Sequence, residues 1–348
     1  MRNRFFACMG VPALLIAAVS LTQVTANGQA RTATAKPAPP SSTKTWTPPR
    51  TADGHPDLQG TWNYSTLTPL ERPRDLAGKE SFTEKEAAEY EKSLLEKNNR
   101  DNREGGADAD LARAYNDLWY DSGAHVVKTR RTSLIIDPPD GRIPALTPEA
   151  AKREAARAED RRKRGPEPAD TWEDRSLGER CLTRGAPKLP SAYNNHVQIV
   201  QSPGYVALLQ EMIHEARIIP VDGRPHAAKN IRQWLGDSVG HWEGDTLVVD
   251  TTNYPDMFVM APVNCCPGAG ANLHVIERFK RVDADTIDYQ YTVDDPSTYT
   301  KSWTVSVPMS KTDEPIYEYA CHEGNYGMKN LLSGARAMEK AAAEAKKK

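Results

Sequence analysis

Residues 286–294 read TIDYQYTVD, and every second side chain in this stretch is apolar or aromatic. Ile287, Tyr289, Tyr291 and Val293 share one face, and the residues between them are polar. Strict alternation of this kind is typical of an antiparallel strand with one buried and one solvated face. The stretch therefore predicts a sheet rather than a helical core.

Similar short patterns recur on both sides of this stretch. They predict strands at 132–137, 196–202, 205–214, 216–221, 246–252, 272–282, 299–307 and 316–321. Turn signals such as Asp222-Gly223 separate consecutive strands, and the spacing leaves no room for crossover helices. We therefore expect a mainly β protein in which an antiparallel meander closes into a lipocalin-like barrel, because closure removes exposed strand edges.

Three helical segments precede most of these strands, and we expect them as helical N-terminal additions. Thr83 with Glu86 three positions later forms a capping box for a helix that runs to about Asn98. A shorter helix is predicted over 108–118, and a third over 147–164, where Pro follows the capping Thr. The third segment is rich in charge, which indicates a solvated face.

The chain divides into four segments by composition. Residues 1–26 combine a basic start with an apolar run interrupted by Pro12, which predicts a cleaved signal peptide rather than a membrane anchor. Residues 27–55 form a Pro- and Thr-rich disordered linker, 56–334 a single β-rich domain with helical insertions, and 335–348 a charged C-terminal tail. We therefore expect a periplasmic or secreted protein with no membrane span after signal cleavage.

Charge and cysteine content narrow the function classes. The chain has 45 basic and 47 acidic residues, so no basic field is available to hold nucleic acid. Cys181, Cys265, Cys266 and Cys321 follow the signal, and four cysteines in an oxidising compartment allow three pairings. We favour Cys181–Cys321, because both cysteines flank segments that are predicted to be ordered. A metal site is the alternative, but no CxxC or close Cys/His spacing supports one, and we expect no metal and no cofactor.

The most informative candidate for chemistry is Glu277. In the predicted strand over 272–282 it shares a face with Leu273, Val275 and Phe279. A carboxylate on an apolar face is costly unless a cation compensates it or the group stays protonated. Both outcomes are common at functional sites. The alternative is a buried Arg–Glu pair that only stabilises the fold.

A second carboxylate, Glu211, repeats the pattern. It lies on the same face of a predicted strand as Tyr205, Ala207 and Leu209, whereas His214 lies on the other face. An offset of three places two strand residues on opposite faces, so Glu211 and His214 are not expected to bind one metal ion. We expect Glu211 to face the interior.

These residues suggest an interior that binds a small, partly apolar molecule. Glu277 or Glu211 would transfer a proton, with His241 or His322 as partner and Arg217 or Arg232 holding an anionic group. Polar and aromatic residues near strand ends complete the expected rim: Tyr193, Asn195 and Trp242. The prediction is a lyase, isomerase or hydrolase that uses general acid–base chemistry. The alternative is a carrier or sensor that binds an apolar ligand without turnover.

Several segments resemble an uncharacterised family of secreted proteins that is common in soil bacteria. They are PDLQGTW at 56–62, 134–142, Tyr193-Asn194-Asn195, 210–214, 217–226, GDSVGHWEGDTLVVDTTN at 236–253, 292–296 and 317–326. The resemblance spans most of residues 56–334 and implies no activity. The Gly-x-Trp opening followed by a meander also resembles lipocalin-like barrels, at the level of the fold alone.

Overall fold

The computed structural model describes residues 46–102, 104–112, 117–165, 168–256, 266 and 268–347. All of them belong to the unit Trp46–Lys348. The expected signal peptide at 1–26, and the larger part of the expected linker, lie outside the described residues.

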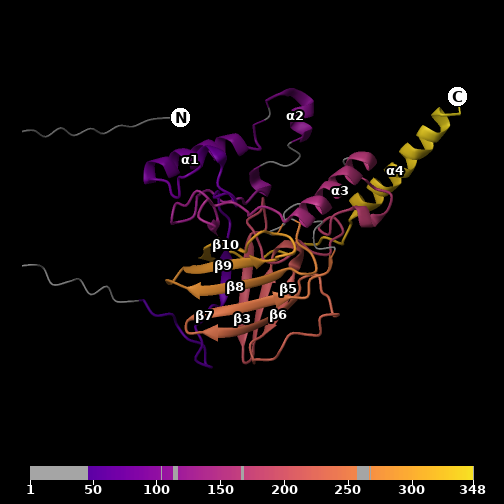
Figure 1. The fold of residues 1–348 in the computed structure, drawn as a ribbon. Helices are drawn as coiled ribbons and strands as arrows, with labels where there is room; N and C mark the ends of the chain where they lie inside the picture. The colour runs from indigo at the N-terminus through magenta and orange to yellow at the C-terminus, as the bar shows by residue number, and fades with distance from the viewer. Residues whose placement is uncertain are drawn as a thin grey trace, which may run out of the picture. The chain divides into compact units, whose positions relative to one another are not determined.

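Eleven antiparallel strands form one sheet (Figure 1). Their bounds are β1 Gly60–Asn63, β2 Ile135–Asp137, β3 His196–Ser202, β4 Tyr205–Gln210, β5 Ala216–Pro220, β6 Asp237–Glu243, β7 Thr246–Thr252, β8 His274–Arg281, β9 Thr286–Asp294, β10 Trp303–Ser306 and β11 Met309–Thr312. The predicted ranges of β3, β7 and β9 are confirmed to the residue. The mainly β, antiparallel fold class is therefore confirmed.

The expected closure into a barrel is wrong. Neighbouring strands follow the order β5-β4-β3-β1-β11-β9-β8-β7-β6, with β10 paired to β9 and β2, and the described ends β5 and β6 share no ladder. Gly240 of β6 shows how these ends approach. A Cβ at Gly240 would lie 2.9 Å from Cγ1 of Val221 and 3.1 Å from Cγ2 of Ile219. Side chains from the β5 end therefore pack against one face of β6, although no ladder joins the two strands.

Two of the predicted strands differ from the structure: one is shorter than expected and the other is absent. The strand expected over 205–214 stops at Gln210, because Glu211 has helical backbone angles and a 3-10 turn, η4 (Met212–His214), follows it. Glu211 is consequently not on the strand face assigned to it, and the inward residues of β4 are Val206, Leu208 and Gln210. The strand expected over 316–321 is also wrong, since that segment has no regular secondary structure.

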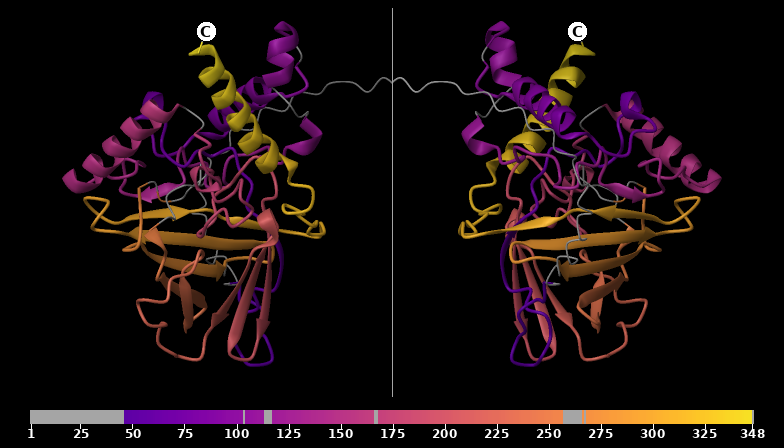
Figure 2. Two further views of the ribbon diagram at one scale, coloured as in Figure 1. Left: turned by 90° about the vertical axis from the view of Figure 1, so that its right-hand side faces the viewer. Right: turned by 90° about the vertical axis from the view of Figure 1, so that its left-hand side faces the viewer.

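Inward-facing aromatic side chains form the core on one face of the curved, open sheet. The predicted alternation in β9 is confirmed, and Tyr289 and Tyr291 are almost fully buried beside Phe279 of β8. Trp62 of β1 and Trp303 of β10 are fully buried in the same cluster. Figure 2 shows β3–β5 running steeply across the direction of β8 and β9. Burial of each such side chain contributes roughly 1.5–3 kcal/mol, so this cluster holds the two parts of the sheet together.

The described helices are α1 (Glu84–Asn98), α2 (Gly106–Ala112), α3 (Pro148–Arg164) and α4 (Tyr326–Ala345). Thr83 caps α1: its hydroxyl accepts from the Glu86 N–H, and the Glu86 carboxylate accepts from the Thr83 N–H. Most of residues 335–348 belong to α4. No helix in the described ranges has both the length and the apolar character needed to cross a membrane.

A disulfide joins Cys181 to Cys321, as predicted, across 140 residues of sequence with a Cα–Cα distance of 5.6 Å. Cys321 lies directly after the irregular segment that replaces the expected last strand, so the disulfide fixes the end of that segment. Stable disulfides are typical of oxidising compartments, and the bond is compatible with an exported protein.

Candidate functional site

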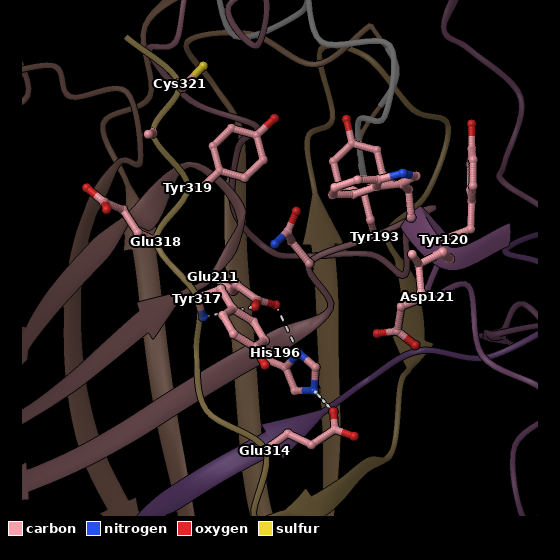
Figure 3. Close-up of a pocket in the computed structure, with 14 residues that line it drawn as sticks. Tyr120, Asp121, Tyr193, His196, Glu211, Glu314, Tyr317, Glu318, Tyr319 and Cys321 are labelled. Carbon is pink, nitrogen blue, oxygen red and sulfur yellow. Dashed lines mark hydrogen bonds and ion pairs between the residues drawn. The ribbon is translucent and has the colours of Figure 1, made fainter. Parts of the chain in front are cut away.

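A cavity of about 870 Å³ lies at the edge of the sheet where β3 begins and β4 ends. Its wall comes from the 3-10 turn η2 (Asp117–Trp119) and the residues after it, from the start of β3, and from the segment after β11 (Figure 3). The lining residues are Leu118, Trp119, Tyr120, Asp121, Tyr193, Asn194, His196, Glu211, Glu314, Tyr317, Glu318, Tyr319, Ala320 and Cys321.

The register of β3 and β4 brings His196 and Glu211 together. Val197 pairs with Gln210, so the residues just outside this pair, His196 and Glu211, face each other at the end of the ladder. The Glu211 N–H donates to the His196 carbonyl at 3.0 Å. Their side chains meet as well, with 2.9 Å between His196 Nδ1 and Glu211 Oε2. Both residues are buried, at 7% and 3% exposure, so this dyad is shielded from bulk water.

Strained backbone follows Glu211 directly. Ile213 has φ of 59° and His214 has φ of 41°, both in the left-handed region. This region is a real outlier for a β-branched residue such as Ile213 and costs roughly 1–3 kcal/mol. Strain of this kind clusters at functional sites, where surrounding contacts fix an otherwise unfavourable geometry. Here the turn directs the Glu211 carboxylate back toward β3.

The cavity wall after β11 is held by the same turn. The Tyr317 N–H donates to Glu211 Oε1 at 3.2 Å, and His214 Nδ1 lies 2.8 Å from the Tyr319 carbonyl. The disulfide at Cys321 fixes the far end of this wall. The irregular segment after β11 is thus held by the Glu211 carboxylate, the His214 imidazole and the disulfide at Cys321.

His196 Nε2 has two polar neighbours that suit different protonation states. Asn63 Oδ1 accepts from the Ser65 N–H, so its Nδ2 faces Nε2 at 3.2 Å as a donor and suits the neutral imidazole. Glu314 Oε2 lies 3.2 Å from the same nitrogen and suits the imidazolium. The hydrogen bond to Glu211 raises the pKa of His196 above its usual value, which favours the imidazolium.

Asp121 is a further carboxylic acid of the cavity, outside the dyad. Burial raises its pKa and the nearby carboxylates of Glu314 and Glu211 add to the rise, which His196 and Asn63 offset in part. Its Oδ2 atom is buried without a hydrogen-bond partner among the described residues. The backbone of Asp121 is fixed by Asn195, whose buried Nδ2 donates to the Asp121 carbonyl. Asp121 and His196 both lie on the cavity in Figure 3.

Of the residues that the sequence singles out, Glu211 and Tyr193 line this cavity. Asn195 lies behind it and positions Asp121, as described above. Glu277 and Arg217 lie elsewhere, in the core of the sheet. Arg217 donates to Glu277 through Nη1 at 2.6 Å and Nη2 at 2.8 Å, and the Tyr289 hydroxyl donates to the same carboxylate at 2.7 Å. This buried Arg–Glu pair is the structural alternative that the sequence left open.

The remaining sequence candidates are not among the residues that line the cavity, and they do not meet. His241 is exposed and pairs with Glu243 at 3.2 Å. Trp242 stacks on His55, with 4.9 Å between ring centroids, and His322 is exposed. Arg232 donates through Nη1 to two backbone carbonyls, at 2.9 and 2.6 Å, and therefore ties loops together.

Sequence reasoning missed His196, Asp121 and Glu314 as site residues. His196 follows a polar Tyr-Asn-Asn run and opens a strand, which was the available signal. Asp121 and Glu314 have no such signal, because they lie in irregular segments that the fold brings together. The predicted disulfide placed Cys321 correctly but identified none of the other residues that line the cavity.

A second polar network lies on the strands at the other end of the sheet. His226 contacts Asp237 through Nδ1 at 2.8 Å and Asp250 through Nε2 at 2.9 Å, and His274 Nε2 lies 2.8 Å from the other oxygen of Asp250. Within the described ranges, no group of three or more His, Cys, Asp or Glu side chains fits a metal ion. The network links β6, β7 and β8 to the loop before β6, and it does not line the cavity.

Comparisons with protein-family models, curated proteins and solved structures give no match. The chemistry therefore has to be argued from the site itself. Its defining features are a buried His–Glu dyad, a second carboxyl group with a raised pKa, and an aromatic wall.

Proposed function

We propose that this protein is an exported enzyme that acts on a small molecule by general acid–base chemistry, with His196 as the proton-transfer residue. The observation that carries the proposal is the buried contact between His196 Nδ1 and Glu211 Oε2 at 2.9 Å on a cavity large enough for a ligand. A carboxylate on Nδ1 fixes the tautomer and orientation of an imidazole, and Nε2, which contacts Asn63 and Glu314 in this structure, is the nitrogen that would face the reacting group.

In this proposal Nε2 takes a proton from the substrate or from a water molecule, and Glu211 stabilises the imidazolium that forms. Glu314 is within reach of the charged ring, and Asn63 is within reach of the neutral one. Asp121, with its raised pKa, is the second proton donor or acceptor. His196 and Asp121, as two proton-transfer groups on one cavity, suit a lyase, an isomerase or a hydrolase.

The disulfide supports an oxidising location. We place the protein in the periplasm or outside the cell, with residues 1–26 as the signal peptide. Partners other than a small molecule, nucleic acid included, have no role in this proposal.

The test is a turnover screen with matched variants. Wild type is incubated with p-nitrophenyl esters, p-nitrophenyl glycosides, hydroxy acids and amines, and products are followed by mass spectrometry. For a compound that is turned over, His196→Gln is expected to lower kcat by about 10²–10⁴-fold. Glu211→Gln is expected to lower kcat less and to shift the acidic limb of the pH profile, because the imidazolium loses its partner.

His322→Gln is the control, since His322 is exposed and lies outside the cavity lining. Its kcat should equal that of wild type. Full turnover in His196→Gln would show that the dyad does not transfer the proton, and the proposal would fail.

The second candidate function is a carrier or sensor. It is favoured by the exposed aromatic surface of the cavity, where Trp119 is 64% and Tyr317 is 68% exposed. Such surface binds a partly apolar ligand without any chemistry. Native mass spectrometry of protein from its host separates the two functions. A retained, unmodified ligand supports the carrier, and release of a product from the screen supports the enzyme.

A further inference from the structure

The charged side chains on the described wall of the cavity are mainly negative. Among the residues that the structure describes, the 14 that line the cavity include four carboxylic acids, Asp121, Glu211, Glu314 and Glu318, and no lysine or arginine. His196 is the only basic side chain among them, and its Nδ1 is already engaged by Glu211. Arg184, whose charge acts on Tyr193, is not among the described lining residues. An anionic ligand would meet net repulsion here, whereas a cation would be attracted.

The acidic groups are incompletely compensated. Oδ2 of Asp121 is buried and has no hydrogen-bond partner among the described residues. The Glu314 side chain is 70% exposed and reaches His196 at 3.2 Å. A buried acceptor without a donor costs free energy. The negative charge of the Asp121 and Glu314 carboxylates favours a cation in the cavity over a neutral or anionic ligand.

Aromatic rings supply the second element of recognition. The wall carries Trp119, Tyr120, Tyr193, Tyr317 and Tyr319. The faces of such rings attract cations, and cages of aromatic rings are the usual receptors for quaternary ammonium groups. The rim already shows this preference within the chain, because the Arg100 guanidinium lies 4.7 Å from the centre of the Tyr120 ring.

We infer that the cavity binds an organic cation, a molecule with an amine or quaternary ammonium group held between the aromatic wall and the carboxylates of Asp121 and Glu314. The inference rests on the proposed function, because it names the ligand class of the same cavity. A neutral carbohydrate is the main rival, since sugars also use aromatic faces and carboxylates. The carbohydrate is disfavoured because the negative charge of the wall does not increase the affinity for a neutral ligand.

The experiment compares three probes that share size but differ in charge. Choline carries the cation, 3,3-dimethylbutan-1-ol is its neutral isostere, and 3,3-dimethylbutyrate is an anion of similar shape. Binding is measured by isothermal titration and by intrinsic tryptophan fluorescence at low salt. Choline is expected to bind at least about tenfold more tightly than the alcohol, and the anion not at all. The preference should shrink as salt is raised, because exposed charges are screened.

Matched variants locate the binding. Asp121→Asn and Glu314→Gln keep the shape and remove one charge each, so each is expected to weaken choline severalfold and to leave the alcohol unchanged. Tyr317→Leu should weaken choline more than Tyr317→Phe, which keeps the ring. Glu344→Gln, on α4 far along the chain, is the control and should bind as wild type does.

The outcomes separate this inference from the proposed function. Equal affinity for choline and the alcohol, or tighter binding of cellobiose than of either, overturns the cation class but leaves the cavity as a ligand site. Absence of binding by every probe, cellobiose included, counts against the cation and against the cavity as a binding site. Tight choline binding by wild type with normal turnover in His196→Gln supports the ligand class and rejects the acid–base role.

Discussion

Removing Arg217 should destabilise the protein strongly, because it leaves a carboxylate unpaired inside the core. Glu277 is 1% exposed, and its oxygens accept two hydrogen bonds from Arg217 and one from Tyr289. In Arg217→Met only the Tyr289 hydroxyl remains. Breaking a buried pair from one side costs about 3–5 kcal/mol. That is a large part of the roughly 5–15 kcal/mol by which folded proteins are stable.

Replacing both partners should restore most of the loss. In the double variant Arg217→Met/Glu277→Leu no buried charge is left, and substitution of a buried ion pair by apolar residues is often neutral or stabilising. The coupling between the two positions in a double-mutant cycle is therefore expected to exceed about 3 kcal/mol.

The assay is urea unfolding followed by the near-ultraviolet circular dichroism of the buried tryptophans, with the disulfide intact. Arg278→Met is the control from the same strand, because Arg278 pairs with Glu243 at 2.7 Å on the exposed face. Loss of that surface pair should cost about 1 kcal/mol or less. If Arg217→Met costs no more than Arg278→Met, or if the double variant is as unstable as the single one, the reasoning about the core pair is refuted.

Three further outcomes follow from other parts of the fold. Cys181→Ser opens a loop of 140 residues and is expected to cost about 2–5 kcal/mol in urea unfolding and to weaken probe binding, because Cys321 ends the cavity wall; unchanged binding would contradict this role. The bond to Asp250 raises the pKa of His274, so its stabilisation is present below about pH 6.5 and is lost as the pH rises through the folded-state pKa. The destabilisation of His274→Gln, about 1 kcal/mol or less, should therefore shrink between pH 6 and pH 9, and a constant difference would refute it. Thr83→Ala removes the cap of α1 and should cost about 1 kcal/mol, whereas Thr83→Ser should cost little.

Alternation of side chains was enough to predict the strands whose two faces differ. β9 is the clearest case, since its inward residues are apolar and its outward residues are polar over the whole length. The end of β4 was not predictable in this way. Residues up to Ile213 continue an apolar pattern, but the turn at Glu211 depends on contacts with His196 and Tyr317, which are distant in sequence.

The order of the strands in the sheet was a second feature that the sequence did not predict. Local turn signals predict which strands are neighbours along the chain, but β1 pairs with β3 and β11, and these pairings are not local. Closure was expected from the cost of exposed edges alone. In the structure no ladder joins β5 to β6, although side chains of Ile219 and Val221 lie close to Gly240.

The candidate site was predictable only in part, for the same reason. A carboxylate on an apolar face identified Glu277, and physical chemistry allowed either a functional group or a structural pair. The structure has the pair with Arg217. The dyad depends on His196 at a strand start and on Glu211 in a turn, so no periodicity marks both.

The central claim is that the chemistry lies at the His196 cavity and not inside the sheet. The most direct measurement compares turnover of one screened substrate by His196→Gln and by the double variant Arg217→Met/Glu277→Leu, after urea unfolding has shown both to be folded. The account predicts that His196→Gln loses activity by about 10²-fold or more and that the double variant keeps a kcat close to that of wild type. Loss of activity in the double variant with full activity in His196→Gln would contradict it.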